Sequence, residues 1–170
     1  MKQYLILIGL VLCCLSCSEQ EADNSKLRSI LTDQLKYSYT DQNWYVPPKV
    51  AINGLTAEQS NWQDSTDNNS IGGLVAHMTF WNEMQIRAFK GEDFSDFEID
   101  NDITFTTTEW EKATKKLDSV QTELQLMVEN ASEEQLAAWA TDLLNLSAHN
   151  AYHAGQIVHI RKRNGWWKKK

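Results

Sequence analysis

The side chains in this sequence best suited to metal chemistry are its four histidines, His77, His149, His153 and His159. His149 and His153 are four residues apart, so on a helix they lie on one face and can bind one metal ion together. His77 lies among apolar residues that repeat at helical spacing, which predicts a histidine that faces the core. His159 lies about 120° around the helix from His153 and is expected to point elsewhere.

These positions predict a metal site made of His77, His149 and His153, with no fourth ligand from the protein. Three ligands and an open position are typical of catalytic zinc sites rather than structural ones. Imidazole also binds Ni, Co and Fe(II), so the ligands do not fix which divalent ion is bound. The alternative is a structural bundle whose histidines bind nothing, because pairs of histidines at this spacing are common on helices.

Three further residues bear on this site. Gln156 lies one turn beyond His153 and could hydrogen-bond a ligand ring or a bound water from the second shell, or it could be a polar residue at the rim. Glu83 lies about 120° from His77 on its helix, so no general base is evident beside the ligands. Gly155 is expected to allow another helix to approach closely. Whether the site is catalytic is left open by these residues.

Composition excludes several other kinds of site. All three cysteines, Cys13, Cys14 and Cys17, fall within the first 17 residues. The rest of the chain therefore has no disulfide framework, no zinc–thiolate site and no cysteine nucleophile. The chain has 16 basic and 23 acidic residues and a formal net charge of −7. Because phosphate backbones bind basic surfaces, we expect no nucleic-acid partner.

Long helices are predicted to position these residues. The first begins at Ser25 and ends before Pro47-Pro48, because two prolines cannot continue a helix. The second begins after an N-cap serine, Ser70, and ends at Gly91. The third has apolar residues spaced by three and four, at Trp110, Ala113, Leu117, Val120, Leu124 and Met127.

The fourth long helix is predicted from Thr141 to about Asn164, after a short segment that opens at Ser132-x-x-Gln135. Residues 92–105 are acidic and are expected to form an irregular loop. No alternation typical of strands is present, so the predicted fold class is an all-α, four-helix bundle. Patterns typical of capping boxes also occur at Thr56-x-x-Gln59, Thr106-x-x-Glu109 and Thr108-x-x-Glu111.

The N-terminal residues have the features of a bacterial lipoprotein signal peptide. Lys2 is followed by an apolar run over residues 4–12, which is too short to span a membrane and has the length of a signal-peptide core. Ser16 and Cys17 then resemble the end of a lipobox, with Cys17 as the lipidated residue. Cys14 stands where a leucine is usual, so lipidation at Cys14 is an alternative.

The predicted organisation has four parts. Residues 1–16 form the signal peptide, residues 17–24 a polar tether, residues 25–164 the helical bundle, and residues 165–170 a basic tail with Trp and Lys. The tail could be a charged helix end that complements the helix dipole. Alternatively, it could contact a membrane surface and reinforce a lipid anchor.

Two segments resemble motifs of the DinB family of metal-dependent four-helix proteins. Residues 70–82, SIGGLVAHMTFWN, resemble its second-helix motif, and residues 149–157, HNAYHAGQI, look like its last-helix motif. The turn at residues 54–59, GLTAEQ, is also similar to the family's segment between its first two helices. The resemblance covers about residues 25–164.

The resemblance implies an up-down-down-up four-helix bundle, often a homodimer, in which His77, His149 and His153 bind one divalent ion. Some relatives are thiol-dependent transferases or isomerases. We therefore expect a membrane-anchored lipoprotein of the bacterial cell envelope with a divalent-metal site, acting on an unknown small molecule as a metal-dependent hydrolase or a thiol-dependent transferase. The alternatives are a non-catalytic metal- or ligand-binding lipoprotein, or a structural bundle.

Overall fold

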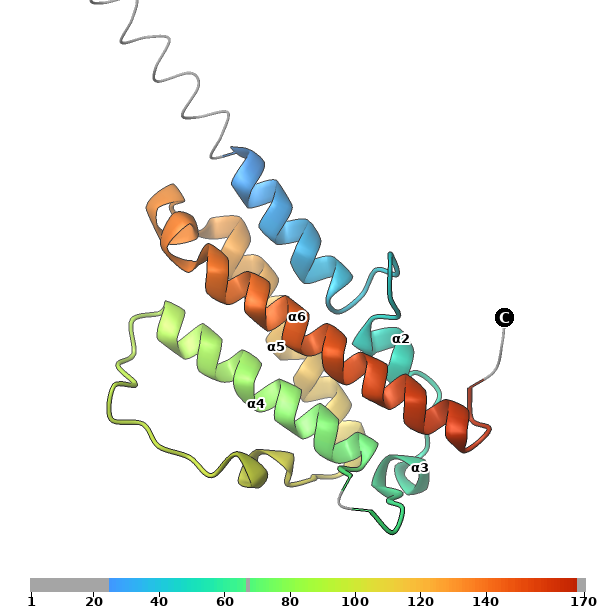
Figure 1. Cartoon of the computed structure of the whole chain (residues 1–170). Coiled ribbons are helices and arrows are strands. Elements are labelled where there is room, and N and C mark those ends of the chain that lie inside the picture. Colours follow the sequence, from blue (N-terminus) through green and yellow to red (C-terminus); the bar gives the residue numbers. More distant parts are fainter. Residues whose placement is uncertain (1–24, 67, 168–170) are drawn as a thin grey trace, which may run out of the picture.

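The computed structural model describes residues 25–66 and 68–167, and every regular element in these residues is a helix (Figure 1). The predicted all-α class is therefore confirmed. The elements are a helix over residues 25–37, α2 (Pro48–Ile52), α3 (Ala57–Asn61), α4 (Ile71–Phe89), the 3₁₀-helix η1 (Asn101–Phe105), α5 (Trp110–Asn130) and α6 (Glu133–Arg163).

Two predicted parts of the chain lie outside the described residues. These are the signal peptide over residues 1–16 and the tether over residues 17–24 with its candidate lipidation site, Cys17. The last three lysines of the basic tail also lie outside them. No helix in the described part of the chain is both long and apolar enough to span a membrane.

The four long helices form a bundle with the predicted up-down-down-up order (Figure 1). The helix over residues 25–37 and α6 run in one direction, and α4 and α5 run in the other. Because α4 and α5 follow each other and are parallel, the chain between them must return along the length of the bundle. Residues 90–109 make this connection and carry η1.

Three helices begin at the capping residues predicted from the sequence. The Ser70 side chain accepts a hydrogen bond from the backbone N–H of Gly73 at the start of α4. Thr56 with Gln59, and Ser132 with Gln135, form complete capping boxes at the starts of α3 and α6. These caps satisfy backbone N–H groups that have no partner inside the helix.

The structure corrects the predicted start of the last helix. Ser132 opens one continuous helix of 31 residues that ends at Arg163, not a short segment followed by a second start at Thr141. The residues between contain no glycine or proline, and Leu136 and Leu143 are both buried, so the apolar face continues without interruption.

The two capping boxes that the sequence offered before the third helix are not formed, although the helix begins at Trp110, where its apolar pattern starts. Thr106 and Thr108 do not cap it, because Glu109 occupies the N-cap position of α5 and no side chain caps that helix. Thr106 instead ends η1, which forms where an irregular loop was expected. The prediction that Gly155 allows another helix to approach closely is also wrong. Outside its own helical turn, no atom of the described residues lies within 4 Å of the position that a Cβ would take.

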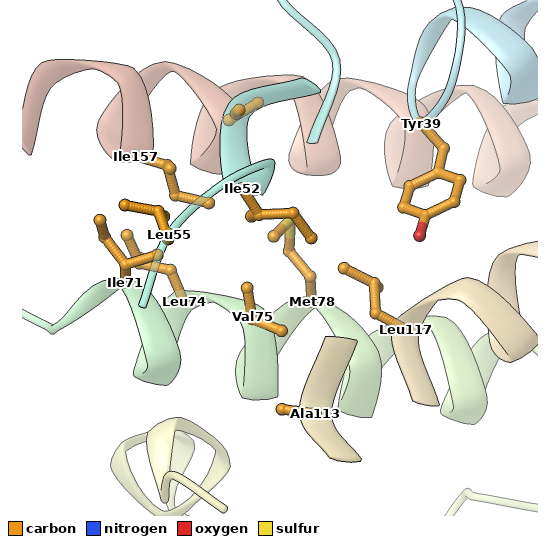
Figure 2. Packing of buried hydrophobic residues seen from close by; sticks show 12 residues of the cluster. Tyr39, Ile52, Leu55, Ile71, Leu74, Val75, Met78, Ala113, Leu117 and Ile157 are labelled. Carbon is orange, nitrogen blue, oxygen red and sulfur yellow. The ribbon is translucent and has the colours of Figure 1, made fainter. Parts of the chain in front are cut away.

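The core consists of two apolar clusters, one toward each end of the bundle. The first, shown in Figure 2, joins α2, α4, α5 and α6, and Val75, Met78, Leu117 and Ile157 in it have no exposed surface or almost none. Full burial of each such side chain stabilises the fold by about 1.5–3 kcal/mol. This cluster fixes α4 and α6 side by side, and these are the two helices that carry the predicted ligands.

The end of the bundle where the helix over residues 25–37 begins is fixed by Arg28. Its guanidinium donates hydrogen bonds to the carbonyl oxygens of Val128 (2.8 Å) and Ala131 (2.9 Å), at the turn between α5 and α6. It also forms an ion pair with Glu133. At the opposite end lie α3, the start of α4 and the end of α6 (Figure 1).

Candidate metal centre

The structure brings together the three histidines that the sequence singled out. His77 comes from the second turn of α4, and His149 and His153 come from successive turns in the middle of α6. The Nε2 atom of His149 lies 3.0 Å from Nε2 of His77 and 2.9 Å from Nε2 of His153. His77 and His153 are only 4% and 6% exposed and His149 is half-buried, so the rings converge at the inner face of α6.

Oxygen acceptors fix the orientation of two of these rings. Nδ1 of His77 lies 2.6 Å from the hydroxyl of Thr104, which itself donates to the carbonyl of Asn101 at 2.5 Å. The hydroxyl proton is thereby used, so the hydroxyl accepts from Nδ1–H. Nδ1 of His153 lies 2.6 Å from the side-chain oxygen of Gln156, which also accepts. Assigned from these bonds, both rings carry their proton on Nδ1 and direct the Nε2 lone pair toward His149.

The third ring shows why a cation fits between the three. His149 Nε2 faces two Nε2 lone pairs, and a single ring proton could serve only one of them. Its Nδ1 is buried and has no hydrogen-bond partner among the described residues. Two nitrogens that bind one tetrahedral zinc ion are about 3.3 Å apart, from the usual Zn–N distance. The observed separations of 3.0 and 2.9 Å are a few tenths of an ångström smaller.

Burial keeps the three rings neutral, which is the form that binds metals. Burial, helped by the neighbouring histidines, lowers the pKa of His77 to about 4, and the same causes lower the pKa of His149 to about 4. Burial also lowers the pKa of His153, and the hydrogen bond that its ring donates to Gln156 partly opposes this effect. At neutral pH none of these groups is charged, so no repulsion opposes a divalent ion.

The connection between α4 and α5 completes the site. Phe105 stacks face to face on the His77 ring, with centroids 4.0 Å apart and planes 7° apart. Thr104 is 5% exposed. A Cβ on Gly73 would lie 3.1 Å from the carbonyl oxygen of Phe105, so any side chain there would require this segment to shift by a few tenths of an ångström. Sequence reasoning missed Thr104 and Phe105, because they lie in the segment expected to be irregular.

A cleft of about 670 Å³ reaches this centre from one side. His153 and Phe105 line it beside the histidine cluster, and Gln156, His159 and Arg163 line it further toward the C-terminal end of α6. Gln156 contacts the ring of His153, one of the candidate ligands, and it also lines the cleft. His159 lies outside the histidine cluster, as predicted, but it is not remote from the site, because it belongs to the cleft wall.

The donor set consists of imidazoles alone. His77, His149 and His153 are close enough to share one ion. In the part of the chain that the structure describes, no aspartate, glutamate or cysteine joins this group. Glu83 forms an ion pair with Lys116 of α5 and does not reach the group. An ion bound here would keep at least one position free for water or a ligand.

One of the comparisons with known proteins identifies a family. A family model described as the DinB superfamily matches residues 49–159, a range that includes all three histidines. No curated protein and no solved structure gave a significant match to the chain.

Proposed function

The chain belongs to the DinB superfamily, and we propose that His77, His149 and His153 bind one divalent metal ion that acts on a small molecule held in the adjoining cleft. The observation that carries this proposal is the convergence of three Nε2 atoms from α4 and α6, two of them oriented by an acceptor on Nδ1. Zinc suits this donor set best, and Ni, Co and Fe(II) are further candidates.

Hydrolysis is the reaction class that we propose. When bound, a divalent ion supplies a Lewis acid and lowers the pKa of bound water to about 7. The protein's own groups orient and cover the ligand rings. Thr104 and Gln156 accept hydrogen bonds from the rings of His77 and His153, and Phe105 covers one face of His77. Tyr152 accepts a hydrogen bond from Gln156 at 3.3 Å at the edge of the cleft. Hydrolysis requires no thiol cofactor, and a thiol-dependent transferase is the alternative reaction at this centre.

Metal analysis tests the proposal directly. Protein purified without added ions should contain about one divalent ion per chain, and alanine variants of His77, His149 and His153 should each lose most of it. His159→Ala is the matched control, since His159 lies on the same helix but outside the cluster. Wild-type protein without bound metal, even after incubation with zinc, would refute the proposal, and so would metal loss in His159→Ala alone.

We also propose that the chain is a lipoprotein of the bacterial cell envelope, anchored to a membrane through a lipid on Cys17. The support is the order of a basic residue, a short apolar run, a small residue and a cysteine in residues 1–17. A homodimer remains a prediction from the family resemblance.

A further inference from the structure

The cleft extends beyond the metal centre toward the C-terminal end of α6. His153, Gln156, His159 and Arg163 line it in that order. With a rise of about 1.5 Å per residue, the backbone at His159 lies about 9 Å from that at His153, and the backbone at Arg163 lies about 15 Å away. A ligand whose reactive group is at the histidines therefore has room for a chain of several atoms that ends near His159 and Arg163.

Arg163 is held in place by an acidic side chain that is not itself free to bind a ligand. Its Nη1 donates to Oδ2 of Asp64 at 2.5 Å. The other oxygen of Asp64 accepts from the backbone N–H of Thr66 at 2.9 Å and from the Thr66 hydroxyl. The side chain of Asp64 is 11% exposed, whereas that of Arg163 is 56% exposed. Asp64 thus orients Arg163, whose remaining N–H groups are accessible.

The remaining wall has an apolar part and polar donors. Trp62, Ile160 and Leu74 supply apolar surface, and Trp62 is fixed by an edge-to-face contact with Trp166 at 5.8 Å. His159 is exposed and adds a ring N–H beside Arg163. A guanidinium held in place by an ion pair, as Arg163 is by Asp64 in the wall of the cleft, is a specific donor for a planar acid group.

We propose that this cleft binds an organic acid in an extended form, with its acid group at His159 and Arg163 and its reactive group at the three histidines. The proposal rests on the proposed function, because the metal centre defines the reactive end. It narrows the substrate class to molecules that have an anionic group about 9–15 Å from the bond that reacts. The apolar wall fits a hydrocarbon chain or ring between the two ends.

Two matched probes test this inference on the zinc-loaded full chain. Suberic acid monohydroxamate has a hydroxamate, which binds zinc, and a carboxylate six methylene groups away. Its methyl ester has the same length without the charge. Calorimetric titration should show the acid binding at least roughly tenfold more tightly than the ester, since a charged hydrogen bond is made only by the acid. His159→Gln and Arg163→Gln should each remove most of this preference.

Lys162→Gln is the matched control, because Lys162 is exposed, adjacent to Arg163 and not in the cleft wall. It should keep the preference for the acid, and zinc content and melting temperature should be the same in all three variants. The inference would be overturned if the wild type bound acid and ester equally, or if Arg163→Gln and Lys162→Gln changed the preference for the acid equally. Neither result would contradict the proposed metal centre. A wild-type chain that takes up no zinc would instead refute the proposed function.

Discussion

The hydrogen bond between His77 and Thr104 can be removed by a single substitution that hardly changes the shape of the side chain. Thr104→Val keeps the shape of the side chain but leaves Nδ1 of His77 without its acceptor, now 2.6 Å away. Partners of this kind orient a ligand ring, and their loss costs about 10- to 100-fold in metal affinity. Competition with a chelator would measure the change.

Thr106→Val is the matched control for this variant. Thr106 is exposed and lies in the same connection, two residues further along the chain. It should keep wild-type metal affinity. If both variants bind metal as tightly as the wild type, the bond from His77 to Thr104 does not position the ligand.

The buried histidines also predict how the metal-free protein responds to acid. Burial holds the pKa of His77 and His149 at about 4, below the reference value of 6.5. Between these values the unfolded chain binds more protons than the folded chain, so the free energy of unfolding decreases as the pH falls from 6.5 to 4. Metal affinity should weaken over the same range, because protonated rings do not bind metal.

Urea unfolding of chelator-treated protein between pH 8 and pH 4 would check this dependence. His77→Leu should flatten it, and His159→Leu should leave it unchanged. The same slope in the wild type and in His77→Leu would assign the acid sensitivity to groups other than the histidines.

At the scale of elements, the helix faces that carry the three histidines could be predicted from the sequence. The connection over residues 90–109 that contacts His77 could not. The positions of His149 and His153 follow from helix geometry alone, and those of Ser70 and His77 follow from a local cap and an apolar stripe. Phe105 reaches His77 only because residues 90–109 return along the bundle, and this depends on distant contacts that no local pattern specifies. The predicted start at Thr141 is wrong because no glycine or proline interrupts the helix between Ser132 and Thr141.

The close approach of α4 to this connection gives a prediction about Gly73. In Gly73→Ala the new Cβ would lie 3.1 Å from the carbonyl oxygen of Phe105, so residues 104 and 105 must shift away from His77. Metal affinity should fall several-fold by the loss of ring orientation. Chelator competition together with thermal unfolding would measure both effects.

Gly155→Ala provides the comparison, because a Cβ at Gly155 meets no described atom within 4 Å. It should raise the free energy of unfolding by about 1 kcal/mol through helix propensity and leave metal affinity unchanged. A Gly73→Ala variant that binds metal like Gly155→Ala would show that the connection tolerates displacement.

At the scale of the whole molecule, the proposed anchor has a simple test. Cys17→Ser removes the thiol that would carry the lipid, so the chain should move from the membrane fraction to the soluble fraction after cell disruption. Cys13→Ser is a matched control that should stay with the membranes. A Cys17→Ser chain that still sediments with membranes would contradict lipidation at this residue, and release by Cys14→Ser alone would assign it to Cys14.

Arg28 and the cleft lie at different ends of the bundle, and this separation determines how far the site would lie from a lipid anchor on Cys17. The side chain of Arg28, in the first helix, contacts the turn between α5 and α6. His153 lies 20 residues beyond Glu133 along α6, or about 30 Å from that turn. A lipid on Cys17 would therefore join the bundle at the end away from the cleft. The cleft would then lie about 30 Å along the bundle from the end that carries the anchor, a distance close to the thickness of the hydrocarbon layer of a membrane. The length of the bundle and the tether over residues 17–24 would together set how far from the point of anchoring this site could act.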